Sequence, residues 1–229
     1  MPSGNQITAL GARVSTLFRA ASCALALAAA FSLLATPFPS VAAAQITKAD
    51  EEQALEFTKS LSERAFAVLR DASISPRERD LEFRRLLRDG VAVDVVGNLL
   101  LGHYRKVMNR EQYDRYHEVF PDFLIKRYTD NILEIGDERV VFESTTPFKT
   151  RTVFVRTRLE SADGARIANA DWRIQKMGEG DFKVIDVAIE GISLARTIRD
   201  QFRHQIQRDG FDVFIDSIAK EAAQVSYRG

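Results

Sequence analysis

The stretch ADWRIQKMGEGDFKVIDVAIE, residues 170–190, decides the fold. Its apolar residues recur at every second position, which is the period of a β-strand with one buried face. The sequence GEGD at 178–181 separates two such runs, 168–177 and 182–190, and is typical of a hairpin turn. We therefore predict two neighbouring antiparallel strands. The residues expected on their inner face are Trp172 and Ile174 on the first strand, and Ile185, Val187 and Ile189 on the second.

The same alternation extends upstream of this hairpin. Residues 151–160 form a strand-like run with Val153, Val155, Thr157 and Leu159 on one face, and Asp163-Gly164 indicates a turn after it. Residues 139–144 are also strand-like. The last three strands should form an antiparallel meander, although Phe182 and Val184 make the opposite face of the last strand apolar at its start.

Segments with helical periodicity flank the strands on both sides. The helices expected before them are 48–70, 76–90 with Ser75 as cap, 91–101, and 109–132, in which Pro121 could introduce a kink. Two more are expected after them, at 193–208 and 211–222, separated by Asp209-Gly210. This order predicts an α+β domain whose antiparallel sheet is covered by helices on one face.

The first 44 residues have the composition of a cleavable Sec signal peptide. They contain Arg13 and Arg19 but no acid, a mostly apolar run over 20–35, and small residues up to Ala44. We predict a signal peptide at 1–44, a single domain at 45–229 and a periplasmic location. The apolar run is shorter than the ~20 residues that a membrane span needs, which disfavours an uncleaved anchor. The chain without the leader holds 32 acidic and 30 basic residues, a net charge of −2, so nothing suggests a nucleic-acid partner.

The segment GISLA at 191–195 is close to the G-x-S-x-G nucleophile elbow of serine hydrolases. A triad needs a histidine and an acid beside the serine, and His204 is the sole histidine that follows Ser193. On one helix, the two positions are eleven apart in sequence, which is a rise of about 16 Å. We therefore interpret Ser193 as a helix cap.

Other candidate chemistry is sparse. His103, His117 and His204 lack metal-ligand spacing, and Cys23 lies within the leader, so we expect neither a metal nor a cofactor. Asp186 lies among apolar strand residues, where a buried carboxylate needs a partner. It could be a general base, together with Tyr104 or Tyr128, in a cone-shaped isomerase or dehydratase; the alternative is an ordinary pairing with an arginine or with backbone N–H groups.

Several motifs near the C-terminus resemble the signature of the MlaC/Ttg2D family. The matching residues are Asp171-Trp172-Arg173-Ile174, Phe182-Lys183-Val184-Ile185-Asp186-Val187, Glu190-Gly191-Ile192-Ser193-Leu194, Arg199, Phe202, Gly210-Phe211 and Ile215. The family comprises periplasmic phospholipid carriers, also called toluene-tolerance auxiliary proteins. The resemblance implies an NTF2-like or cystatin-like cone with an apolar cavity that holds the acyl chains of a phospholipid.

The resemblance also implies partners, namely an inner-membrane ABC transporter complex and an outer-membrane lipoprotein complex, with the carrier itself a monomer. Related carriers are encoded with hopanoid-synthesis genes, so the ligand could be a hopanoid. On this interpretation the chain is not an enzyme. A ligand-free envelope adaptor is a further alternative.

Apolar residues on the inner strand faces and on the helices opposite them are the expected lining of the cavity. They are Leu99, Leu100, Phe120, Phe123, Leu124, Tyr128, Val153, Val155, Trp172, Ile174, Val187 and Ile189. The Trp172 N–H needs a polar neighbour, as at a cavity mouth. The pairs Arg84-Arg85 and Arg156 with Arg158 could bind a partner or a lipid phosphate, or could be solvated.

Overall fold

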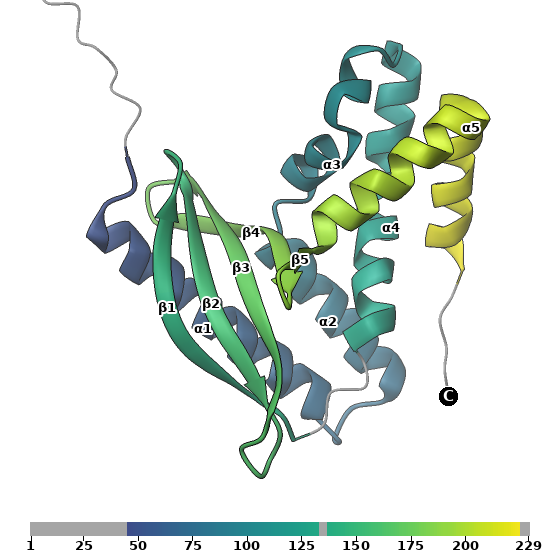
Figure 1. Ribbon diagram of the computed structural model, residues 1–229. Coiled ribbons are helices and arrows are strands. Elements are labelled where there is room, and N and C mark those ends of the chain that lie inside the picture. The colour runs from purple at the N-terminus through teal and green to yellow at the C-terminus, as the bar shows by residue number, and fades with distance from the viewer. Residues whose placement is uncertain (1–44, 133–136, 225–229) are drawn as a thin grey trace, which may run out of the picture. The chain divides into compact units, whose positions relative to one another are not determined.

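The alternating segments of the sequence form a sheet in which each strand pairs with the next along the chain (Figure 1). The structure is a computed structural model that describes residues 45–132 and 137–224. Within these residues the sheet has five antiparallel strands: β1 (Arg139–Phe148), β2 (Thr152–Glu160), β3 (Arg166–Gly178), β4 (Asp181–Ile189) and the short β5 (Ile192–Ser193). The predicted meander is confirmed, and β5 is an addition to it. The expected leader, residues 1–44, lies outside the described part, so its boundary stays a prediction.

Helices α1 (Lys48–Arg70) and α2 (Pro76–Gly90) pack on one face of this sheet (Figure 1). Both begin with a capping box. The side chain of Thr47 or Ser75 accepts a hydrogen bond from the backbone N–H of the third helical residue, and the acid at that third position accepts one from the backbone N–H of the cap residue. The cluster between these helices and the sheet, here called the sheet core, contains Ala54, Leu61, Leu69, Phe83, Leu86, Val153, Val155, Ile174, Phe182 and Val184.

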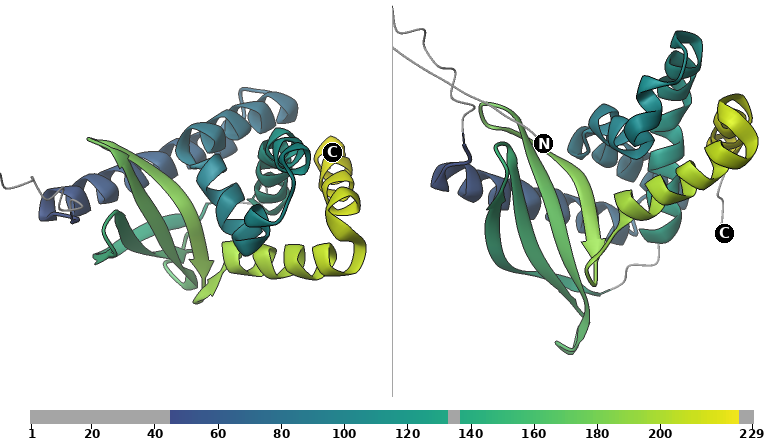
Figure 2. Two further views of the ribbon diagram at one scale, coloured as in Figure 1. Left: turned by 90° about the horizontal axis from the view of Figure 1, so that it is seen from above. Right: turned by 45° about the horizontal axis from the view of Figure 1, so that its top comes forward.

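The remaining helices pack mainly on one another and also contact β4. They are α3 (Val93–Leu101), the 3-10 helix η1 (Gly102–Lys106), α4 (Arg110–Ile132), which runs on through Pro121, and α5 (Leu194–Ala223). Their cluster, here called the helical core, is rich in aromatic rings such as Tyr116, Phe120, Phe202 and Phe214. Figure 2 shows α4 between α3 and the second half of α5.

Helix α5 consists of two arms, as the Asp209-Gly210 pair predicted. Gly210 has φ 78° and ψ 174°, which are not helical values, and the chain changes direction there (Figure 2). Ser193 caps the first arm, because its side chain accepts from the N–H of Arg196. The expected α+β architecture is therefore confirmed, together with the interpretation of Ser193 as a cap. No helix of residues 45–132 and 137–224 is long and apolar enough to cross a membrane.

The prediction for the inner face of β4 was wrong at Ile185. The β3–β4 register shifts between Arg173 and Ile174, so that Arg173 pairs with Asp186 but Ile174 pairs with Val184. Such a bulge inserts one residue and exchanges the two faces of a strand. Phe182 and Val184 therefore belong to the sheet core, where Val187 also packs, while Ile185 joins the helical core.

Candidate functional site

The structure divides the predicted cavity-lining residues between two packed cores. Leu100, Phe120, Phe123 and Leu124 are at most 2% exposed in the helical core, and Val153, Val155 and Ile174 are fully buried in the sheet core. Trp172 and Val187 pack at the edge of the sheet core, whereas Ile189 is 38% exposed. The side chain of Tyr128 lies outside the described part of the chain. These residues are thus not brought together around one space, and their role as lining stays a prediction.

Trp172 has its polar partner inside the sheet rather than at a cavity mouth. Its indole N–H donates to Thr157 Oγ1 at 3.0 Å, and Thr157 is itself 2% exposed. The need of a buried N–H for an acceptor is therefore met by the neighbouring strand. This removes the reason for placing Trp172 beside a headgroup.

Leu99 is a predicted lining residue that borders two pockets. It lies on α3 at the edge of the helical core and borders two adjoining pockets of about 620 and 420 Å³. These volumes fall in the range of ligand sites, about 300–1,000 Å³. Both pockets also share Arg173 of β3 and Arg199 of α5. We call the two pockets together the basic groove.

The basic groove lies between α3 with η1, the side of the sheet opposite α1, and the first arm of α5. Its apolar wall is formed by Val95, Leu99, Phe148, Phe154, Ile185, Ala188 and Ala195. The rings of Phe148 and Phe154 are 5.0 Å apart, and the Arg173 guanidinium lies over the Phe148 ring at 5.7 Å. The basic residues of the lining are His103, Arg105, Lys106, Arg173, Arg196 and Arg199, and its acidic residues are Asp171 and Asp186. A groove of this kind suits an amphiphile that carries negative charge.

Gly102 adopts a backbone conformation that favours glycine. The glycine has φ +57°, and a Cβ built there would be 3.7 Å from the Cδ of Arg199. A non-glycine residue rarely adopts this backbone conformation. The turn at Gly102 thus ends α3, and the stem of Arg199 lies within ordinary contact distance of it.

Asp186 lines the groove, but its carboxylate is already engaged. It accepts from the Ser193 hydroxyl at 2.6 Å and from the Ala195 backbone N–H at 3.0 Å. The carboxylate therefore satisfies the first turn of α5, where free N–H groups favour an acid. This agrees with the ordinary interpretation of Asp186, here with a hydroxyl as the additional donor. Tyr104, its suggested catalytic partner, packs edge-on against Phe211 at 5.8 Å.

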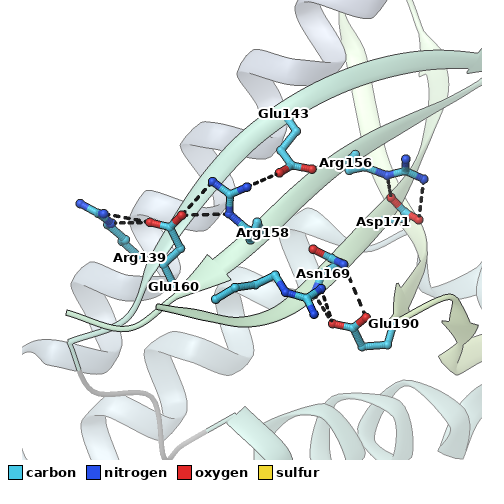
Figure 3. Close-up of polar contacts among 9 residues, drawn as sticks. Arg139, Glu143, Arg156, Arg158, Glu160, Asn169, Asp171 and Glu190 are labelled. Atoms are coloured by element: carbon cyan, nitrogen blue, oxygen red, sulfur yellow. Dashed lines mark hydrogen bonds and ion pairs between the residues drawn. The ribbon is translucent and has the colours of Figure 1, made fainter. Parts of the chain in front are cut away.

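The arginines that the sequence suggested for phosphate binding are all in ion pairs. Arg84 bonds Asp80 and Arg85 bonds Glu82 within α2. On the outer face of the sheet, Figure 3 shows Arg156 beside Asp171 and Arg158 between Glu143 and Glu160.

Further ion pairs lie on the same face of the sheet (Figure 3). Arg139 also bonds Glu160, and Arg166 lies 3.6 Å from Glu190. Hydrogen bonds from Arg158, and then from Arg139, hold the pKa of the Glu160 carboxyl below its usual value. The bond to Asp171 raises the pKa of Arg156. The part of the outer sheet face around Arg156, Arg158 and Glu160 is therefore a set of ion pairs rather than an anion site.

The groove cations were missed at the sequence level. Arg173 alternates with the inner residues Trp172 and Ile174, which predicts only that it points outward. Arg199 lies in the family signature, but its position relative to β3 depends on how α5 folds back beside the sheet. Among the residues that the structure describes, no cluster of His, Cys, Asp and Glu could hold a metal ion.

Comparison with known proteins places these features in a family. The family profile described as MlaC protein matches residues 59–220. The toluene tolerance protein Ttg2D of Pseudomonas putida is 26% identical over 140 residues, which are 59% of this chain and 64% of that protein. The intermembrane phospholipid transport system binding protein MlaC of Haemophilus influenzae is 20% identical over 137 residues, 58% of this chain and 64% of that protein. These alignments span just under two thirds of each relative.

A solved structure shares the fold. The phospholipid-binding protein from Ralstonia solanacearum, determined in complex with a phospholipid, superposes with a TM-score of 0.62 at 18% sequence identity. The superposition covers 75% of this chain and 97% of that one. Since the family profile extends over well more than half of the sequence, the chain belongs to the MlaC protein family.

Proposed function

We propose that the chain is a periplasmic lipid carrier that holds a phospholipid in the basic groove. The observation that carries this proposal is the groove itself, whose apolar wall around Leu99, Phe148 and Phe154 meets a set of arginines. The family match, and the relatives named as phospholipid-binding and phospholipid transport proteins, support it.

A carrier of this kind keeps the acyl chains of a lipid out of water. A diacyl lipid exposes roughly thirty methylenes, and their transfer to water costs on the order of 20 kcal/mol at ~0.8 kcal/mol each. Free diffusion between two membranes is therefore negligible. An apolar wall replaces the bilayer contacts, so loading and release can be nearly balanced, and the partners decide the direction. The partners proposed here are an inner-membrane ABC transporter complex and an outer-membrane lipoprotein complex.

Acyl chains would lie along the apolar wall of the groove. The predicted residues within the two cores would reach a lipid only if the packed side chains separated, so we propose Leu99 as the principal predicted contact. A hopanoid remains an alternative occupant, because the same wall could hold a polycyclic hydrocarbon. The isomerase or dehydratase alternative is weaker, since the Asp186 carboxylate is held by Ser193 and Ala195.

Lipid carried through purification tests the proposal. The full chain is expressed in a Gram-negative host, purified without detergent and extracted with organic solvent, and phospholipid is measured per chain. We expect close to one lipid per chain for the wild type and a loss of at least half in Leu99→Trp, which fills the groove. The matched control is Val107→Trp, which adds the same ring at a residue that is 64% exposed and outside the groove. Equal lipid in both variants would contradict the proposed site, and none in the wild type would contradict the carrier.

A further inference from the structure

The basic groove holds several cations that form no ion pair with a carboxylate of the described residues. No ion pair within 45–132 and 137–224 involves Arg105, Lys106, Arg173, Arg196 or Arg199. The neighbouring sheet arginines, by contrast, are paired (Figure 3). The excess is local, because the chain as a whole is formally neutral.

Three elements bring these cations to the same groove. Arg173 comes from β3, Arg105 and Lys106 from η1, and Arg196 and Arg199 from α5. The two α5 residues are three positions apart, so they share a side of the helix. Arg173 and Arg199 border both pockets and therefore lie where the two pockets adjoin.

Arg173 has an unmet hydrogen-bonding requirement. Its Nε is buried and has no hydrogen-bond partner in the described part of the chain, while its guanidinium lies over the Phe148 ring. A buried donor without an acceptor is destabilising, and guanidinium groups bind phosphate oxygens with strong, directional bonds. An anion in the groove would supply the missing acceptor.

The acids of the groove do not provide a site for a cation. Asp171 bonds Arg156 at 2.7 Å, and Asp186 accepts from Ser193 and Ala195. The ammonium of a zwitterionic headgroup would enter a groove in which cations outnumber carboxylates, and both carboxylates already accept hydrogen bonds from the protein, so the cations would repel it. A headgroup with a net negative charge meets no such repulsion.

We propose that Arg173 and Arg199 bind the phosphate of a lipid headgroup, and that the groove selects net-anionic glycerophospholipids over zwitterionic ones. This inference rests on the proposed carrier function and adds the class of lipid to it. The apolar wall formed by Leu99, Phe148 and Phe154 favours an amphiphile over an acidic protein surface, since it borders the same cations.

A headgroup competition tests the selection. Delipidated full-length protein is incubated with vesicles that contain equal amounts of phosphatidylglycerol and phosphatidylethanolamine with identical acyl chains, then re-isolated, and bound headgroups are quantified. We expect phosphatidylglycerol to exceed phosphatidylethanolamine by about tenfold, the effect of one charge-assisted interaction. Arg173→Gln and Arg199→Gln should each bring the ratio close to one. The matched control is Arg203→Gln, one turn further along α5, where the arginine pairs with Asp200; its ratio should match the wild type.

The outcomes separate the two proposals. Two results would overturn the headgroup inference and leave the carrier function intact. In the first, the wild type binds close to one lipid per chain but takes phosphatidylglycerol and phosphatidylethanolamine equally. In the second, Arg199→Gln and Arg203→Gln show the same headgroup ratio as each other. If Arg199→Gln keeps the wild-type headgroup ratio but transfers lipid to acceptor membranes more slowly, the headgroup inference is also overturned, and the cations are assigned to partner docking. If no lipid binds but inorganic phosphate binds and is lost in Arg199→Gln, the site takes a free anion, and both the carrier function and the headgroup inference fail.

Discussion

A side chain in the sheet core and one beside the groove differ in what a substitution would do. Val155 is fully buried in the sheet core, whereas Leu99 is half-buried and borders the groove. Adding atoms to a packed core forces strain, while adding them beside a pocket fills space. The sequence marks both residues equally as apolar and inward, so this distinction depends on the tertiary packing.

We expect Val155→Trp to lower the free energy of unfolding by about 1–3 kcal/mol or more, because the larger ring cannot fit the sheet core. Leu99→Trp should leave it within about 0.5 kcal/mol of the wild type. Urea unfolding followed by circular dichroism measures both. A stable Val155→Trp protein that has lost its lipid would instead place the ligand within the sheet core, as the sequence first suggested.

The Ser193 hydroxyl both caps α5 and donates to the Asp186 carboxylate. Ser193→Ala removes the cap and leaves Asp186 with one donor fewer, so we expect a loss of about 1–2 kcal/mol in unfolding free energy. Ser193→Thr, which retains the hydroxyl, should recover most of it. Unchanged stability in Ser193→Ala would show that neither bond contributes.

The direction change in α5 depends on Gly210. Its φ of 78° lies in the left-handed region, and nothing lies within 4 Å of a Cβ built there, so strain rather than a clash limits substitution. Gly210→Ala should lower the unfolding free energy by about 1 kcal/mol. The matched control is Gly178→Ala, at a glycine without a left-handed φ whose added Cβ would first meet Asp181 at 4.0 Å. Equal effects of the two changes would contradict the backbone argument.

An ion pair joins α1 to β3 and makes this contact sensitive to acid. Lys176 Nζ lies 2.6 Å from Asp50 Oδ1, and the hydrogen bond from Lys176, followed by those from Thr47, lowers the pKa of Asp50. A lowered carboxyl pKa stabilises the fold above the usual carboxyl range, and the benefit is lost as the pH falls below about 4. The bond raises the pKa of Lys176, so its own contribution is lost only in strong alkali.

Asp50→Asn should therefore be less stable than the wild type at pH 7, and the difference should shrink at pH 3. Chemical unfolding of both proteins at the two pH values measures this. A difference that is the same at both would mean that the carboxylate charge does not contribute.

Local signals predict the helices and strands well. The periodicity over 48–70 matches α1, and Ser75-Pro76 and Asp209-Gly210 mark the start of α2 and the change of direction in α5. The bulge at Ile185 could not be predicted, because both faces of β4 are apolar where the register shifts. The groove was beyond prediction for a related reason: it depends on how α5 and η1 lie relative to the sheet.

At the scale of the whole described unit, the sheet has two different faces. One is closed by α1 and α2 over the sheet core (Figure 1). The other carries paired charges (Figure 3), and beside them, next to α3 and α5, lies the basic groove. Because the packed face of the sheet is the apolar one, the alternation of apolar residues in the sequence predicted lining residues on that face and not in the groove. The open face is where hydrocarbon and phosphate can be held together.

Native mass spectrometry of the full-length chain, expressed in a Gram-negative host and purified without detergent, tests the central claim most directly. A bound lipid should appear as a mass increment of one phospholipid that disappears after organic extraction, and Leu99→Trp should lack it while Val107→Trp retains it. A spectrum that shows only the bare polypeptide mass, from protein that is folded by circular dichroism, would contradict the account.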